Sequence, residues 1–195
     1  MTNTYRILKR ISHNRKDDGF ARIVVASTKL VKLHNTNSSI NHFSKAQQIL
    51  GEKNPRVFFC LGVSHLNRLG TKNNTNRSLT LLKSFTFFFN YYNLSNKSQE
   101  ASFNLARAFH QVGFFYLAVP FYERAIEMGK ELRKEDEKMI DEKEEEEGKN
   151  LFEIGSSSNP LDYNLESESY FNLHLIYKKS GNNDLANECI EKIVL

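Results

Sequence analysis

The sequence lacks several features on which whole classes of protein depend. Its only two cysteines, Cys60 and Cys189, give neither a metal-binding spacing nor a disulfide framework. No stretch reaches the roughly 18 consecutive apolar residues of a membrane span. The first twenty residues contain no apolar segment of the kind found in signal peptides. We therefore expect a cytosolic or nuclear protein with two reduced thiols and no membrane partner.

Motifs for catalysis and cofactor binding are also missing. There is no Gly-rich phosphate loop, no HExxH and no GxSxG. The six histidines are scattered, so helix packing or surface exposure explains each better than catalysis. The run EKEEEEGK has no apolar neighbours that would desolvate its carboxylates, which makes it a solvated charge run. We predict no enzyme, no metal, no cofactor and no small-molecule substrate.

Charge is divided unequally along the chain. Residues 1–100 hold 16 Lys and Arg against 4 Asp and Glu, whereas residues 101–195 hold 11 against 19. Such polarity indicates either a basic face for an acidic partner or nucleic acid, or simply solvated surface. The residues of the candidate basic contact face are Lys9, Arg10, Arg15, Lys16 and Arg22, with Lys29 and Lys32 continuing a basic arm.

Apolar periodicity predicts helices over most of the chain. Residues 1–55 read as a basic, weakly patterned segment with one or two helices, of which 21–33 fits a helix or a short strand and 35–39 reads as a break. Residues 56–195 read as a repeat domain, interrupted by an acidic flexible insertion at 131–160. Antiparallel pairs are expected at 56–69 with 77–92, 101–113 with 115–129, and 168–180 with 183–194.

Two of these pairs repeat one another. When they are aligned on Gly113 and Gly181, matching residues lie 68 positions apart, twice the period of about 34 residues of the tetratricopeptide repeat (TPR). The spacing predicts that large residues fill each hairpin, that small ones stand at the helix crossings, and that glycines end the first helices. The predicted repeat-packing residues are Leu105, Ala106, Phe109, Gly113, Ala118, Tyr122, Ala125, Leu173, Tyr177, Gly181 and Ala186.

These matches predict an all-α fold of antiparallel helical hairpins of the TPR type, stacked as a short solenoid. In the first copy Ala106 replaces the usual glycine, and Pro120 requires its helix to begin near Phe115. In the second copy His174 and Ile193 occupy positions that are normally small. We therefore expect looser packing in the second hairpin.

Longer stretches resemble one particular family. ASFNLARAFHQVGFFYLAVPFYERAI (101–126) is similar to a stretch near the C-terminus of the TPR-bearing subunit of transcription factor IIIC, and YFNLHLIYKKSGNNDLANECI (170–190) is similar to its closing segment. Upstream, CLGVSHLNRL and NRSLTLLKSFTFFFNYYNL resemble two further helices of that subunit, with Ser84 where a glycine is typical. The matching residues include Asn104, Arg107, His110, Gln111, Tyr122 and Asn172.

The resemblance covers about 56–195 and implies a function. It implies a nuclear, non-catalytic scaffold that binds other factor IIIC subunits and factor IIIB components, and that reaches DNA indirectly through the complex. Family members are several times longer, so we expect a C-terminal piece or a shortened relative. Two alternatives stay open: a generic TPR adaptor of the chaperone- or complex-assembly type, and a nucleic-acid binder that uses the basic arm. Against the chaperone type, Arg107 stands where its carboxylate clamp uses asparagine.

Overall fold

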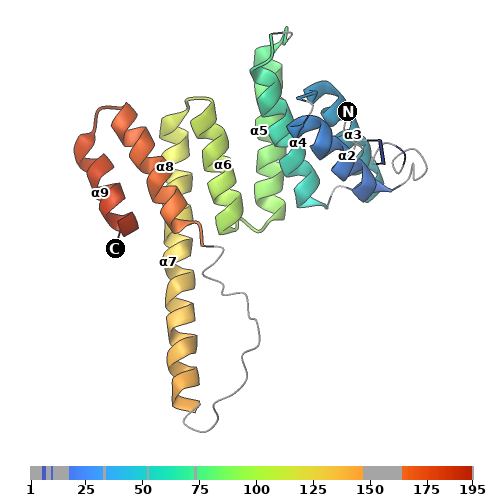
Figure 1. Cartoon of the computed structure of the whole chain (residues 1–195). Coiled ribbons are helices and arrows are strands. Elements are labelled where there is room, and N and C mark those ends of the chain that lie inside the picture. The colour runs from blue at the N-terminus through green and yellow to red at the C-terminus, as the bar shows by residue number, and fades with distance from the viewer. Residues whose placement is uncertain are drawn as a thin grey trace. The chain divides into compact units, whose positions relative to one another are not determined.

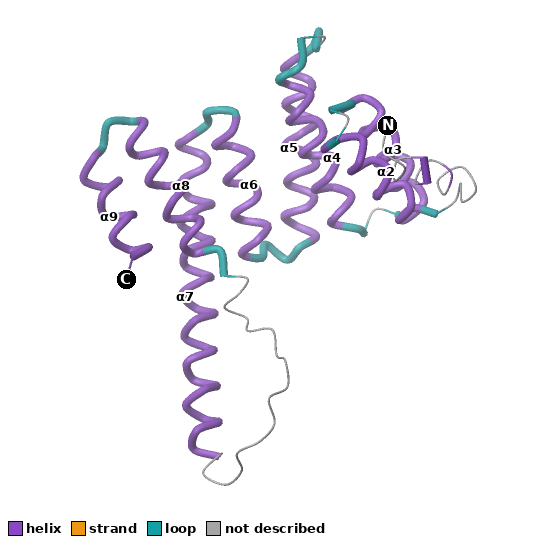
Figure 2. Tube along the Cα trace, viewed as in Figure 1, coloured by secondary structure: helices purple, strands orange, loops and turns teal. Residues whose placement is uncertain are grey.

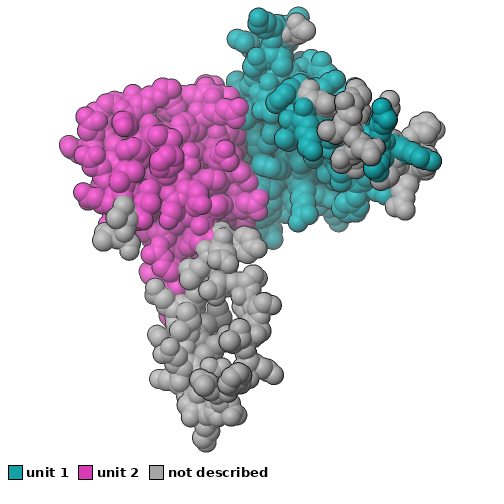
Figure 3. All heavy atoms as spheres, in the orientation of Figure 1, with its two compact units in different colours: residues 1–97 teal, residues 98–195 magenta. Residues whose placement is uncertain are grey.

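The chain folds into α-helices joined by turns. The computed structural model describes Arg6, Ile7, Arg10 and residues 18–32, 34–51, 53–72, 74–146 and 164–194. None of these described residues forms a strand, and Figures 1 and 2 show the succession of helices. The predicted all-α fold is confirmed. Two compact units divide the chain, residues 1–97 and residues 98–195, which Figure 3 draws in different colours.

The first unit contains four helices in its described part. They are α2 (Gly19–Val31), α3 (Thr36–Leu50), α4 (Pro55–Leu69) and α5 (Arg77–Leu94). Each packs against the next, and the fully buried side chains of Ala26, Phe43, Val57 and Leu61 form a core shared by α2, α3 and α4. The structure therefore groups the N-terminal helices with α4 and α5 and does not divide the chain at 55/56, where the sequence predicted a boundary.

The segment 35–39, predicted to be a break, instead starts a helix. The Asn35 side chain accepts a hydrogen bond from the Ser38 backbone N–H at 3.0 Å, so α3 begins at Thr36. An asparagine followed by serines satisfies the free N–H groups of a first turn as readily as it forms a loop. The ambiguous run that starts at residue 21 is helical as far as Val31, within α2, whose N-cap is Asp18.

The crossing of α4 and α5 depends on two small residues. Ser84, which is fully buried, donates a hydrogen bond to the Gly62 carbonyl oxygen at 2.8 Å. A Cβ atom added at Gly62 would lie 3.0 Å from the Phe88 ring, so glycine lets the two helices approach closely. Ser84 therefore stands where the family that the sequence resembles has a glycine, and it does so without separating the two helices.

The second unit contains the two predicted hairpins. Its helices are α6 (Gln99–Gln111), α7 (Phe115–Glu146), α8 (Glu166–Lys179) and α9 (Asn183–Val194). Each packs on the next. Gly113 and Gly181 have φ angles of 84° and 81°, the left-handed conformation that glycine adopts without strain. The N–H after each glycine bonds back to the preceding helix, from Phe114 to Phe109 and from Asn182 to Tyr177. Both hairpins thus turn through the same C-terminal motif.

Helix α7 is longer than the sequence predicted. It begins at Phe115 as expected but does not end at 129, and its backbone remains helical to Glu146. Residues 130–146 consist mostly of Lys, Glu and other strong helix formers, which favour a helix even where the sequence offers no apolar face. The first half of the segment predicted to be a flexible insertion is therefore helix, and residues 147–163 lie outside the described residues.

Replacing Ala118 by leucine is expected to destabilise the second unit. Ala118 is fully buried on α7, which packs against α6, so a larger side chain must force the two helices apart. Overpacking of this kind costs about 1–3 kcal/mol, and urea unfolding should measure it. Tyr116→Leu, at an exposed position of the same helix, is the control and should leave the unfolding curve nearly unchanged. Equal stability of the two variants would contradict the close crossing at Ala118.

Candidate binding groove

A polar groove lies on the second unit. It has a volume of about 310 Å³ and takes its lining from three helices: α6, α7 and α8. The lining residues are Arg107, His110, Gln111, Tyr122 and Asn172. All five belong to the stretches that resemble the factor IIIC subunit, so the residues that carry the resemblance also meet in space. We call this the polar groove.

Two aromatic groups form the inner wall of the polar groove. The Tyr122 ring is fully buried and meets the Phe103 ring edge to face at 5.8 Å, while its hydroxyl lies 3.4 Å from Nδ1 of His110. Burial raises the pKa of Tyr122, so its hydroxyl stays neutral. Burial, together with the nearby charges of Lys179 and Arg107, lowers the pKa of His110. At neutral pH this wall therefore offers an uncharged hydroxyl and an uncharged imidazole.

One cation and two amides complete the lining, and a second cation lies close to it. Arg107 is exposed, and its guanidinium lies over the Phe103 ring at 5.8 Å. The Lys179 ammonium lies over the Phe115 ring at 4.8 Å and acts electrostatically on His110. Such positions hold a cation on an aromatic face while its remaining donors face outward. Together with Gln111, these groups suit a ligand rich in carbonyl or carboxylate oxygens, such as a peptide segment with acidic residues.

Most of the predicted repeat-packing residues are buried in the two hairpins, and their role in packing the repeats stays a prediction. Tyr177 is half-buried, and both glycines stand at the turns already described. Tyr122 is the member that also lines the polar groove. The buried members are Leu105, Ala106, Phe109, Ala118, Tyr122, Ala125, Leu173 and Ala186. His174, which stands where a small residue is usual, has Nδ1 2.9 Å from the Ala186 carbonyl oxygen, so a polar contact replaces close packing there.

The candidate basic contact face stays a prediction. Lys9, Arg15 and Lys16 lie outside the described residues, Arg10 is exposed, and Arg22 is partly buried on α2. Lys29, which the sequence assigned to the same arm, donates to Ser38 Oγ at 2.6 Å and lies 2.8 Å from His42 Nε2. Lys29 therefore takes part in the packing of α2 on α3.

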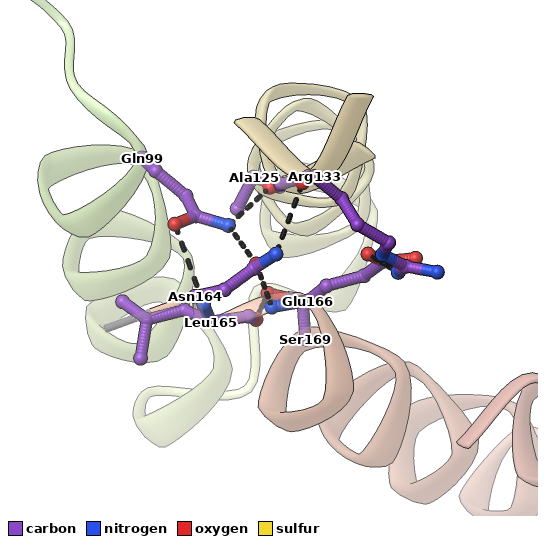
Figure 4. A network of polar contacts seen from close by, with 8 residues as sticks. Gln99, Ala125, Arg133, Asn164, Leu165, Glu166 and Ser169 are labelled. Atoms are coloured by element: carbon purple, nitrogen blue, oxygen red, sulfur yellow. Dashed lines mark hydrogen bonds and ion pairs between the residues drawn. The ribbon is translucent and has the colours of Figure 1, made fainter. Parts of the chain in front are cut away.

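Sequence reasoning missed a buried polar network at the start of α8, shown in Figure 4. The Gln99 amide donates to the Ala125 carbonyl at 3.0 Å and to Asn164 Oδ1 at 2.9 Å, and it accepts from the Leu165 N–H at 3.3 Å. Asn164 in turn donates to the Gly129 carbonyl and accepts from the Glu166 N–H, each at 3.0 Å. The network fastens the first turn of α8 to both α6 and α7.

An ion pair and a glycine complete the network. The Arg133 guanidinium on α7 pairs with the buried Glu166 carboxylate. A Cβ atom at Gly129 would lie 2.5 Å from Asn164 Oδ1 and 2.6 Å from Gln99 Nε2, so only glycine leaves room for the amides. The signal in the sequence that could have indicated this site is Gly129, a glycine inside an otherwise helical run.

Gln99→Ala is expected to loosen α8 and α9 from the rest of the second unit. The change leaves the partly buried Leu165 N–H without its acceptor, which costs about 1–3 kcal/mol. Amide hydrogen exchange should show faster exchange in α8 and α9 than in the wild type. Gln111→Ala, at the exposed end of the same helix, is the matched control and should change the free energy of unfolding by less than about 0.5 kcal/mol. Unchanged exchange in Gln99→Ala would contradict this role of the network.

The chain is similar to three curated proteins. It is 30% identical over 162 residues to "Transcription factor tau subunit sfc4" of Schizosaccharomyces pombe, an alignment that covers 80% of this chain and 14% of that protein. It is 28% identical over 132 residues to "General transcription factor 3C polypeptide 3" of Homo sapiens, covering 68% of this chain and 12% of that one. It is 22% identical over 161 residues to "Transcription factor tau 131 kDa subunit" of Saccharomyces cerevisiae, covering 80% and 13%.

This chain is a homologue of transcription factor IIIC subunits. The resemblance predicted from the residues is thereby confirmed. The chain spans 12–14% of the length of these three relatives. No family model matches the sequence.

The fold also matches that of a solved TPR protein. The crystal structure of MamA superposes with a TM-score of 0.61 at 12% sequence identity and covers 97% of this chain and 84% of its own. At that identity the match shows the fold alone, and it confirms the predicted TPR type. In the part of the factor IIIC homologue that the structure describes, no helix is long and apolar enough to cross a membrane. Within the same residues, no three His, Cys, Asp or Glu side chains gather as a metal site would require.

Proposed function

We propose that the chain is a non-catalytic TPR scaffold of transcription factor IIIC, which joins other subunits of the factor in RNA polymerase III initiation at tRNA-type genes. The 30% identity to a transcription factor tau subunit over 162 residues carries the proposal. The scaffold acts in the nucleus and meets DNA through the complex. Contacts with factor IIIB components belong to the same proposal.

The polar groove is the surface that we propose for a subunit contact. Its lining includes an arginine, two amides and an imidazole, which can hold the backbone carbonyls and side chains of a partner segment. None of these side chains needs to take part in a chemical reaction, because hydrogen-bond donors and acceptors placed on rigid helices are sufficient for binding. Helix-borne side chains of this kind position a partner better than loop residues do.

Affinity purification of the tagged full chain from its own cells tests the proposal. Other factor IIIC subunits should co-purify with the wild type, and Arg107→Glu should reduce their yield because it places a carboxylate in the polar groove. Arg124→Glu is the matched control: Arg124 is exposed on α7, does not line the groove, and undergoes the same change of charge. The control should retain the subunits.

Two results would contradict the proposal. Recovery of chaperones in place of factor IIIC subunits would favour a generic TPR adaptor. Binding of the purified chain to tRNA-gene DNA by itself, with an affinity that falls steeply between low and physiological salt, would favour the basic arm as a nucleic-acid binder.

A further inference from the structure

A second groove lies on the same unit, built by residues separate from those of the polar groove. It has a volume of about 370 Å³ and lies among α7, α8 and α9. Its apolar lining includes the buried side chains of Ile126 and Leu173 and the partly exposed side chain of Leu185. The full lining is Glu123, Ile126, Glu127, Lys130, Tyr170, Leu173, Tyr177, Leu185, Glu188 and Cys189. We call it the acidic groove.

Carboxylates outnumber cations in the acidic groove. Glu123, Glu127 and Glu188 are all exposed, and no ion pair joins any of them to a residue that the structure describes. Glu123 and Glu127 stand four residues apart on α7, and like charges at this spacing disfavour a helix unless a cation offsets them. Burial raises the pKa of Tyr177, and Glu123, Cys189 and Glu188 raise it further, so negative potential reaches into the groove.

The ammonium group of Lys130 already lies in the acidic groove. The Lys130 ammonium lies over the Tyr170 ring at 5.6 Å, and its hydrogen bond with the Tyr170 side chain contributes most to raising the pKa of Lys130. The groove thus holds one cation by an aromatic face and a hydroxyl. The three carboxylates can bind further cations next to the apolar residues of the lining.

We propose that the acidic groove binds a basic amphipathic segment of a partner protein, with Lys or Arg side chains among Glu123, Glu127 and Glu188 and apolar side chains over Ile126, Leu173 and Leu185. Phosphate backbones and anionic membranes do not fit, because like charges would face one another. A second copy, whose residues 1–100 hold 16 Lys and Arg against 4 Asp and Glu, is the other occupant that the sedimentation test distinguishes from a partner. This inference is independent of membership in factor IIIC.

Fluorescence anisotropy with a labelled synthetic peptide of repeated Leu-Lys-Lys-Leu units tests the proposal on the purified full chain. The triple variant Glu123→Gln, Glu127→Gln and Glu188→Gln should bind the peptide about tenfold more weakly, since exposed ion pairs are individually weak and the variant removes three together. The control triple is Glu168→Gln, Asp184→Asn and Glu191→Gln, three exposed acids outside the groove. It makes the same change in net charge and should stay within about twofold of the wild type.

Further peptides separate the contributions of charge and apolar contact. A peptide with Glu in place of Lys should not bind, and one with Ser in place of Leu should bind more weakly than the original. Equal losses in both triple variants would overturn the proposal, because net charge alone would then explain binding. Sedimentation shows whether the chain forms a dimer. A dimer that the triple variant in the acidic groove dissociates, and that the control triple does not, would mean that a second copy and not a partner occupies the groove. Thermal melts of both triples verify folding, and exposed Glu→Gln changes preserve helix propensity.

Discussion

Replacing Tyr122 by alanine should lower the free energy of unfolding of the second unit by about 3–5 kcal/mol. Tyr122 is among the largest fully buried side chains of the described residues, and its ring lies 5.8 Å from the Phe103 ring and 6.1 Å from the His110 ring. Truncation would leave a cavity between α6 and α7, which close-packed helices fill only in part. Urea unfolding, followed by amide exchange in α6–α9, measures the loss.

Tyr122→Phe is the matched variant. It keeps the ring and removes only the hydroxyl that lies 3.4 Å from His110 Nδ1, so its cost should stay below about 1.5 kcal/mol. Because Tyr122 also lines the polar groove, this variant tests binding in a folded protein. Equal destabilisation by the two substitutions would show that the hydroxyl, and not the packed ring, holds the hairpin together.

The features that sequence reasoning predicted are those that depend on neighbours within one hairpin. Leu105 and Phe109 share a helix face because they lie four residues apart, and the glycine after them ends the helix through its own backbone freedom. The family resemblance added the order of the hairpins. Local spacing of this kind is visible without any tertiary information.

The features that it missed depend on contacts between distant segments. The bond between Gln99 and Asn164 joins residues 65 positions apart, and neither residue lies in a helix that the sequence predicted. Both grooves combine side chains from three helices, so no single periodic pattern reveals them. The extension of α7 to Glu146 was missed for a different reason: lack of an apolar face argues against packing but not against helix.

Acidification should destabilise the first unit through His65. This imidazole is buried on α4, stacks on the Phe87 ring at 5.5 Å, and has no hydrogen-bond partner for Nδ1 among the described residues. Burial, followed by the charges of Lys83 and Arg68, lowers the pKa of His65 from 6.5 to about 4. The folded state therefore binds the proton more weakly than the unfolded state. The stability that neutral His65 contributes is fully present above about pH 6.5 and is lost as the pH falls toward 4, by roughly 2–3 kcal/mol.

Two variants and an NMR titration test this assignment. His65→Leu keeps an apolar side chain of similar size against Phe87 and should reduce the slope of stability between pH 6.5 and 4, leaving the smaller share of His42, whose pKa is also lowered by burial and by Lys29. Lys83→Gln removes one of the repelling charges, so the pKa of His65 should move upward toward its ordinary value. The ring proton resonances of His65 report that pKa directly. A titration midpoint near 6.5 in the wild type would show that the ring gains a proton without cost and would remove the cause of the acid sensitivity.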